Sequence, residues 1–316
     1  MISRRLLRIK VLQVLYAYYK SDQKELNLSE KELFFSIGKS YELYHFLLIL
    51  FIEIVDYAES RIELARNKKV PSHADINPHT NFIDNKFIAQ LRSNSNLKSF
   101  IDNNKIGWVQ HPEFIKEIFM LVQEDKDYQD YLELESTDYA ADKKIFSKIC
   151  TDIILPNESL HQLLEEKSIY WNDDLDYIVS MIVKTIKKFK PTDGEEKELL
   201  ALYKNEEDRD YVRMLFRKAI VNRNLSLKLI EEKASNWDLE RIAFMDVIIM
   251  QLAITELIEF KSIPTKVTLN EFLEITKYYS TEKSNSFING VLDKIMQKLK
   301  ADKKIKKTGR GLIGEV

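Results

Sequence analysis

The chain contains few of the residues that break helices or cross-link chains. Its 316 residues include one cysteine, seven glycines and six prolines. The single cysteine, Cys150, excludes an intrachain disulfide and a zinc site built on cysteines, and it fits a reducing compartment. So few glycines and prolines favour helices over strands joined by tight turns. We find no internal repeat and no alternating strand pattern, and we therefore expect an all-α fold.

Long hydrophobic runs are also scarce. The most apolar stretch, residues 43–55, is interrupted by His45 and Glu53. It is shorter than the roughly 20 residues that cross a bilayer. No apolar segment follows the charged N-terminus, as it would in a signal peptide. We interpret residues 43–55 as a buried core helix and expect a cytoplasmic protein.

Charge is distributed unevenly, although the net charge is only −2. Residues 1–20 contain five basic residues and no acidic residue, and residues 206–316 carry a net charge of +3. Residues 21–205 carry a net charge of −10. The two ends therefore suit an anionic partner, whereas the middle would repel one.

Apolar periodicity predicts helices along most of the chain. The first spans residues 3–20, and the second begins near Ser29 and continues to about residue 67. Pro191 and Gly194 indicate a break, and Asn236 is a candidate N-cap. The other helices are expected at 83–92, 96–103, 112–125, 138–154, 156–167, 173–189, 206–234, 237–260, 266–279 and 282–300.

An Asn-Gly pair lies within one of these helical patterns. Phe287, Val291 and Ile295 recur every four residues, which predicts a helix through Gly290. A glycine inside a helix costs roughly 1 kcal/mol relative to alanine. We expect such a glycine where another backbone or a ligand comes close, and a crowded helix crossing is the simpler of these explanations.

Distinctive blocks lie at the two ends of the chain. The N-terminal block is RRLLR at residues 4–8, followed by LQVLY at 12–16. The C-terminal blocks are AITEL at 253–257, IP at 263–264, KVTLNE at 266–271, TK at 276–277 and FINGVLD at 287–293. In order and spacing these blocks resemble the NusB family of bacterial transcription antitermination factors.

The resemblance implies an all-helical core of two packed three-helix bundles, formed by residues 1–20 and 206–300. Residues 21–205 then form a large acidic helical insertion after the first helix, which leaves and re-enters the core at neighbouring points. Residues 301–316 are expected to be a basic disordered tail. The implied ligand is single-stranded boxA-like RNA from a ribosomal RNA leader. The implied partners are a NusE-type small-subunit ribosomal protein and the RNA polymerase antitermination complex.

Three arginines of the first helix are the leading candidates for RNA contacts. Arg4, Arg5 and Arg8 fall within about 100° of arc on one flank of the apolar stripe. Guanidinium groups bind phosphates and stack on unpaired bases. The alternative is a solvated helix N-terminus, although cations in a first turn oppose the helix dipole.

A second candidate patch spans the junction of the helices expected at 266–279 and 282–300. Hydroxyl, amide and first-turn N–H groups at such a junction can meet a phosphate or a base edge. An ordinary capped junction is the alternative. Family members often carry an acid where Lys283 stands, so this lysine would strengthen phosphate attraction and loosen sequence selectivity. The patch comprises Lys277, Tyr278, Lys283, Ser284, Asn285 and Ser286.

Two acidic residues are candidates for the protein partner. The resemblance implies that Glu240 and Asp246 face the basic ribosomal protein. Asp246 lies in an apolar run, where an unpaired carboxylate is costly, so a core ion pair, for instance with Arg241, is the alternative. Glu256 is in line with apolar neighbours, and we expect it to have a structural hydrogen-bonding role.

Two further patterns carry no prediction of a ligand. Residues 309–314 match G-x-G-x-x-G, but that dinucleotide motif requires a preceding strand and a following helix. The histidines 45, 73, 79, 111 and 161 show no metal-ligand spacing. We expect no cofactor, no metal and no enzymatic activity. A methyltransferase with a NusB-like domain would need catalytic cysteines and an α/β domain after residue 300. The main alternative to antitermination is a helical scaffold whose insertion binds a protein and which has lost RNA binding.

Overall fold

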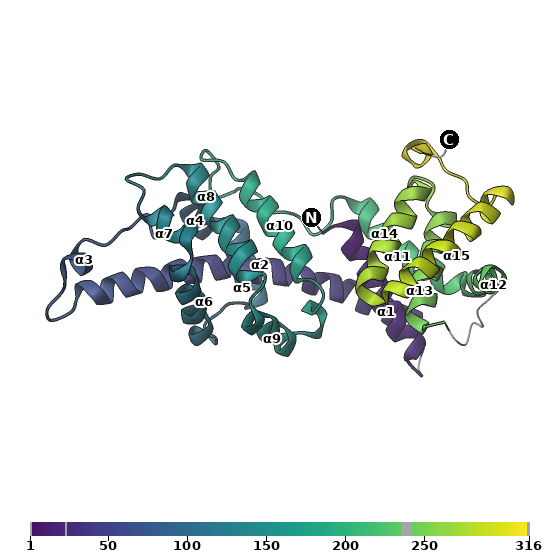
Figure 1. Ribbon diagram of the computed structural model, residues 1–316, viewed down its shortest axis with the longest axis horizontal. Coiled ribbons are helices and arrows are strands. Elements are labelled where there is room, and N and C mark those ends of the chain that lie inside the picture. Colours follow the sequence, from purple (N-terminus) through teal and green to yellow (C-terminus); the bar gives the residue numbers. More distant parts are fainter. Residues whose placement is uncertain (1, 23, 235–241, 315–316) are drawn as a thin grey trace. The chain divides into compact units, whose positions relative to one another are not determined.

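The computed structural model describes residues 2–22, 24–234 and 242–314 (Figure 1). These residues form helices α1–α15, with short 3-10 and π-helical segments and no strand. The prediction of an all-α fold is therefore confirmed for the described part of the chain. Within it, no helix has both the length and the apolar character needed to span a membrane.

The helices group into two compact units, and the long helix α2 (Leu26–Arg66) contributes to both. The first unit comprises Gly38–Leu202 with the first two residues of the chain, and the second comprises Ser3–Ile37 and Tyr203–Val316. The sequence places the N-terminal boundary after residue 20. In the structure residues 21–37 belong to the second unit instead, because the first turns of α2 pack there.

The first unit is built around the apolar part of α2. Leu43, Phe46 and Leu50 are among its fully buried side chains, so the interpretation of residues 43–55 as a core helix is confirmed. The Trp108 ring stacks on Phe46 at 4.0 Å between centroids, and its indole Nε1 donates to the Phe46 carbonyl at 2.8 Å. The surrounding helices are α3 (His73–Ile76), α4 (Lys86–Ser93), α5 (Ser95–Asn104), α6 (Pro112–Glu124), α7 (Lys126–Leu132), α8 (Tyr139–Lys148), α9 (Glu158–Lys167) and α10 (Leu175–Lys188).

The second unit joins the first helix of the chain to the last helices. Its members are α1 (Arg4–Lys20), α11 (Glu206–Val221), α12 (Arg223–Lys233), α13 (Phe244–Glu259), α14 (Thr265–Tyr279) and α15 (Glu282–Ala301). Helix α13 is buried at every position from Asp246 to Leu257, as expected of a central helix that is apolar on all sides. It contacts α1, α11, α12, α14 and α15. In Figure 1 the purple α1 lies among the green and yellow C-terminal helices. The two ends of the chain therefore fold together.

Two predicted helices are interrupted in the structure. The pattern at 206–234 forms two helices, which meet at Asn222, the C-cap of α11 and N-cap of α12. The pattern at 138–154 ends in a π-helical segment, Ile149–Ile154, after α8. The predicted cap Asn236 lies outside the described residues.

The glycine within α15 has open space around it. A Cβ atom built on Gly290 would meet no heavy atom within 4 Å. The expectation that a crowded helix crossing requires this glycine is therefore wrong. Nothing in the described part of the chain needs the side chain to be missing at this point.

The C-terminal segment differs from the predicted disordered tail. After α15, the Thr308 backbone N–H donates to the Lys261 carbonyl at 3.0 Å. The Lys307 ammonium donates to the Phe260 carbonyl at 3.0 Å. A 3-10 turn follows at Gly309–Leu312. The segment therefore returns to the connection between α13 and α14, where it binds the carbonyls of Phe260 and Lys261.

Candidate nucleic-acid interface

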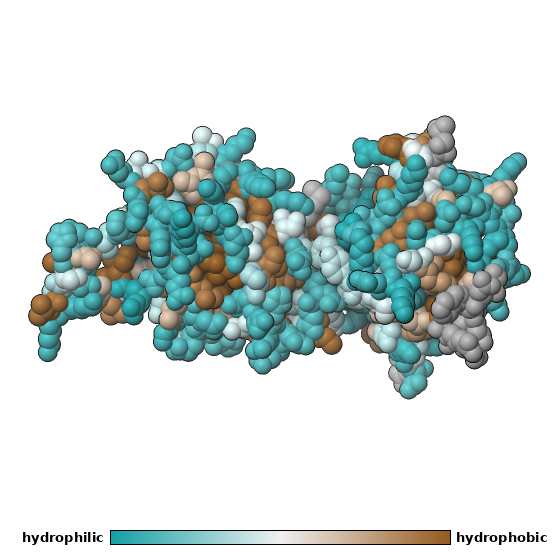
Figure 2. Space-filling view, in the orientation of Figure 1, coloured by the Kyte–Doolittle hydropathy of each residue, from teal (hydrophilic) through white to brown (hydrophobic). Residues whose placement is uncertain are grey.

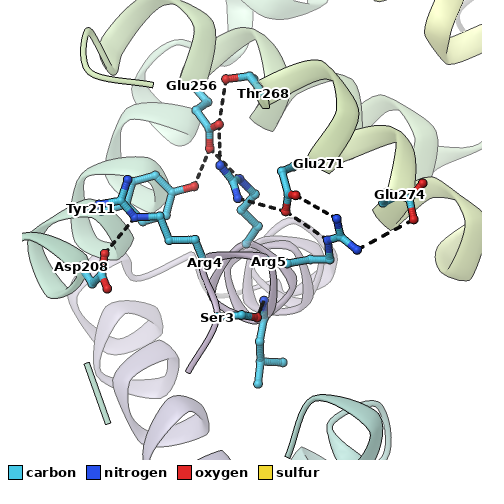
Figure 3. Close-up of polar contacts among 11 residues, drawn as sticks. Ser3, Arg4, Arg5, Asp208, Tyr211, Glu256, Thr268, Glu271 and Glu274 are labelled. Atoms are coloured by element: carbon cyan, nitrogen blue, oxygen red, sulfur yellow. Dashed lines mark hydrogen bonds and ion pairs between the residues drawn. The ribbon is translucent and has the colours of Figure 1, made fainter. Parts of the chain in front are cut away.

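The first two arginines of α1 are partly exposed and paired with acids. Arg4 Nε lies 2.8 Å from the Asp208 carboxylate of α11. Arg5 donates to both oxygens of Glu271 on α14, at 3.0 and 2.8 Å, and lies 3.8 Å from Glu274. Figure 3 shows the two side chains pointing to opposite sides of α1, toward these acids. The first turn of α1 is thus tied to both α11 and α14.

Arg8 lies in the interior of the second unit. It is 1% exposed, and its Nε and Nη2 each donate to an oxygen of Glu256 at 2.8 Å. A third nitrogen lies 3.4 Å from Glu271. The prediction that Arg8 contacts RNA is therefore corrected: a guanidinium at this depth, held bidentately by a carboxylate, cannot reach a phosphate.

Glu256 is the centre of this buried network. It also accepts hydrogen bonds from the Tyr211 hydroxyl and, at 2.8 Å, from the Thr268 hydroxyl (Figure 3). Burial alone would raise the pKa of Glu256, but the charge and hydrogen bonds of Arg8 hold that pKa below its ordinary value. The predicted structural role of Glu256 is confirmed. One residue each from α1, α11, α13 and α14 meets here.

The junction of α14 and α15 combines used and unused polar groups. Thr281 is the N-cap of α15, and its hydroxyl accepts from the Ser284 backbone N–H at 3.2 Å. The Asn285 amide donates to the Leu273 carbonyl at 3.0 Å. Ser284 therefore serves the cap, and Asn285 ties α15 to α14, as in an ordinary junction. Lys283 and Ser286 are exposed, and their side chains have no polar partner among the described residues.

An exposed aromatic ring stands beside these residues. Tyr278 is 73% exposed, and its ring has no aromatic neighbour in the described part of the chain. Lys277, which precedes it, pairs with Glu274. Because Glu274 also lies near Arg5, it links the two patches that the sequence singled out. We call Arg5, Lys277, Tyr278, Lys283 and Ser286 the junction surface.

Asp246, one of the two acidic candidates for a protein partner, lies in the interior of the second unit. Asp246 is 3% exposed, and its carboxylate accepts a hydrogen bond from the Ser280 hydroxyl. Its predicted position on a partner-facing surface is therefore corrected: Asp246 fastens the end of α14 to the start of α13. Glu240 and Arg241 lie outside the described residues.

The acids that neutralise the arginines were missed by the sequence analysis. Asp208, Glu271 and Glu274 each pair with an arginine of α1, from helices far along the chain. One signal was available, because Glu271 and Glu274 are three residues apart and so share a face of α14. The distance in sequence between α1 and these helices hides the pairing.

The sequence comparisons identify the family. NusB of Salinibacter ruber is 37% identical over 139 residues, which cover 42% of this chain and 87% of that protein. The chain belongs to the NusB family. A sequence model of the NusB family matches residues 176–297. NusB of Chloroherpeton thalassium is 43% identical over 84 residues, covering 27% of this chain and 40% of that protein. NusB of Alkaliphilus oremlandii is 36% identical over 92 residues, covering 29% and 67%.

All three relatives carry the name transcription antitermination protein NusB. No solved structure matches the chain. The family match begins at residue 176, within α10, rather than at 206, and it does not include α1. Helix α1 nevertheless packs on α11, α13 and α14. The long intervening segment separates α1 in sequence from helices that it contacts in the fold.

Proposed function

We propose that this NusB-family protein is a non-enzymatic transcription antitermination factor that binds single-stranded boxA-like RNA from a ribosomal RNA leader. In this proposal it acts together with a NusE-type small-subunit ribosomal protein in the RNA polymerase antitermination complex. Family membership supports the role in transcription. The protein partners follow from the resemblance alone, and the RNA follows from the resemblance and from the composition of the junction surface.

The exposed ring of Tyr278 is the observation that carries the RNA proposal. Unpaired bases stack on exposed aromatic side chains, and nearby cations hold the phosphates. Tyr278 is followed by exposed Lys283 and Ser286 at the start of α15, where backbone N–H groups favour anions. A large exposed ring beside cations on a helix junction has no packing role in the described structure.

The arginines of α1 contribute less to RNA binding than their number suggests. Arg4 uses Nε for Asp208, which leaves its other N–H groups available for a second acceptor. Arg5 is shared between Glu271 and Glu274, so a phosphate has to compete with two carboxylates. We therefore assign the main contacts to Lys277, Tyr278 and Lys283, with Arg4 and Arg5 as flanking groups.

The test combines charge reversal with loss of the ring. A Lys277→Glu/Tyr278→Ala/Lys283→Glu variant is expected to lose roughly 100-fold or more in affinity, because one stacked base contributes about 1–3 kcal/mol. The salt slope should also become shallower by about 0.7 for each phosphate contact removed. Filter binding with boxA-like RNA at several salt concentrations measures both quantities. The matched control is Lys69→Glu/Lys98→Glu in the first unit, which changes the net charge equally at exposed lysines without ion pairs among the described residues.

The same assay separates the main alternative, a protein-interaction scaffold without RNA binding. Wild-type protein is titrated with RNA in the absence and in the presence of the ribosomal protein. The proposal expects RNA affinity to rise when the ribosomal protein is present. An absence of RNA binding under both conditions would support the scaffold. Equal affinity for the junction variant and its control would remove the junction surface from the proposal.

A further inference from the structure

The segment after α15 carries charge that the proposed function does not use. Residues 303–314 contain five basic residues and no acidic residue. Lys303, Lys304, Lys306 and Arg310 are exposed. Lys261 and Lys266, from the connection onto which the segment folds, are exposed as well. None of these six side chains forms an ion pair among the residues that the structure describes.

Three glycines allow this segment to adopt its docked conformation. A Cβ on Gly311 would lie 2.0 Å from the Lys261 carbonyl oxygen and 3.0 Å from its carbon, so only glycine fits. Gly309 and Gly314 have φ of 54° and 76°, in the left-handed region that side chains rarely adopt. The three glycines of the G-x-G-x-x-G match thus serve local geometry. The clash at Gly311 involves backbone atoms, which cannot move aside as a flexible side chain can.

The docked position works against the electrostatics of the isolated chain. Like charges repel, and a flexible lysine-rich tail would relieve that repulsion by extending into solvent. Here the Thr308 N–H and the Lys307 ammonium instead bind the Lys261 and Phe260 carbonyls. Cations that form no ion pair within the described part of the chain are thereby held beside Lys261 and Lys266. Such a set of cations suits a polyanion. We call these residues the tail surface: Lys261, Lys266, Lys303, Lys304, Lys306 and Arg310.

We propose that the tail surface is a second RNA contact, which binds phosphates of the same strand without reading its sequence. The inference rests on the proposed function in that the polyanion is RNA. Lysines act as point charges toward phosphate, and such contacts position a strand rather than select bases. Figure 2 shows mainly hydrophilic side chains around the C-terminal segment, with a small hydrophobic spot. The exposed side chains of Leu312 and Ile313 lie in that segment.

Neutralising the tail surface tests the charge. A Lys303→Gln/Lys304→Gln/Lys306→Gln/Arg310→Gln variant is expected to bind boxA-like RNA at least roughly tenfold more weakly. Its salt slope should be shallower by up to about 3, which is 0.7 for each of four contacts. The matched control removes four exposed lysines of the first unit: Lys69→Gln, Lys98→Gln, Lys184→Gln and Lys188→Gln. Circular dichroism establishes that each variant is folded.

Gly311→Ala tests the docking separately, because it keeps every charge. The methyl group cannot coexist with the Lys261 carbonyl, so the segment has to leave its site. We expect a loss of several-fold in RNA affinity, since a mobile tail must be ordered when the strand binds. Gly194→Ala is the control, because its Cβ would meet no atom within 4 Å. Wild-type affinity for Gly311→Ala, with weak binding by the neutralised variant, would overturn the docked surface.

The remaining outcomes are distinguishable. If wild-type protein binds RNA and the neutralised variant matches it in affinity and slope, the tail surface fails while the proposed function stands. If wild-type protein binds no RNA, both fail. Vesicles of one-third phosphatidylserine are tested in parallel. If the neutralised variant loses the vesicle binding of the wild-type protein but keeps its RNA binding, the tail surface belongs to a membrane contact and the inference is overturned.

Discussion

Glu256→Leu is expected to lower the free energy of unfolding by about 3–5 kcal/mol, because it leaves the buried Arg8 without its main counter-charge. Arg8 and Glu256 are both almost fully buried. Their two hydrogen bonds of 2.8 Å satisfy both oxygens of the carboxylate. Glu271, at 3.4 Å, can compensate only partly. Urea unfolding at pH 7 measures the change.

A double variant separates the net stability of the Arg8–Glu256 pair from the cost of leaving either charge buried without its partner. Arg8→Met should cost a similar amount, since it leaves Glu256 buried and charged. Arg8→Met/Glu256→Leu should recover most of the loss, because replacing both charges by apolar groups removes the desolvation penalty. Arg4→Ala should cost no more than about 1 kcal/mol, because the Arg4 side chain is 40% exposed. Equal effects of Arg8→Met and Arg4→Ala would contradict the buried network.

This result also constrains RNA-binding experiments. Removing Arg4, Arg5 and Arg8 together would combine any loss of RNA contacts with unfolding of the unit. An Arg4→Ala/Arg5→Ala variant avoids the buried pair and reports on the exposed guanidinium groups alone.

Acidification is expected to destabilise the first unit by up to about 3 kcal/mol through His45. Burial lowers the pKa of this imidazole from its ordinary 6.5 to about 4, although its contact with the Tyr41 carbonyl opposes the shift. The ring is 2% exposed and stacks on Phe100 at 3.6 Å between centroids. As pH falls through 6.5 the unfolded chain takes up a proton that the folded chain does not. Stability is therefore lost between about pH 6.5 and 4, at about 1.4 kcal/mol for each pKa unit.

His45→Phe isolates this contribution, because it keeps an aromatic ring against Phe100 and removes the titrating group. Unfolding is followed by the fluorescence of Trp108 and Trp171, both buried in the first unit, in a Trp237→Phe background. Other carboxylates and histidines affect both proteins equally, so the difference in pH dependence belongs to His45. Parallel curves of unfolding free energy against pH for the two proteins would show that His45 does not titrate as its burial requires.

The positions of the helices and the family could be predicted from the sequence, because both depend on local sequence patterns. The FINGVLD block and the apolar stripes located α1, α14 and α15 closely, whereas α13 begins at Phe244 and not at the predicted residue 237. The break of one predicted helix at Asn222 was not accessible. Asn222 is the single residue between α11 and α12, within an otherwise continuous helical pattern.

The roles of individual charged residues were less accessible. A helical projection put Arg8 on a basic flank, although it lies three residues from Val11 on the apolar side of α1. The position of Glu256 among apolar neighbours predicted a structural hydrogen-bonding role. The sequence could not name its main partner, Arg8, which lies 248 residues away. The lysine content of residues 301–316 predicted a disordered tail. The sequence could not show the docking, because it depends on the fit of Gly311 against the Lys261 backbone.

Crosslinking shows whether RNA lies on the second unit. Wild-type protein is irradiated with boxA-like RNA that carries 4-thiouridine, and the modified peptides are identified by mass spectrometry. We expect adducts within residues 277–286, at Tyr278 above all, and within 303–310. Adducts confined to residues 38–202 would contradict it.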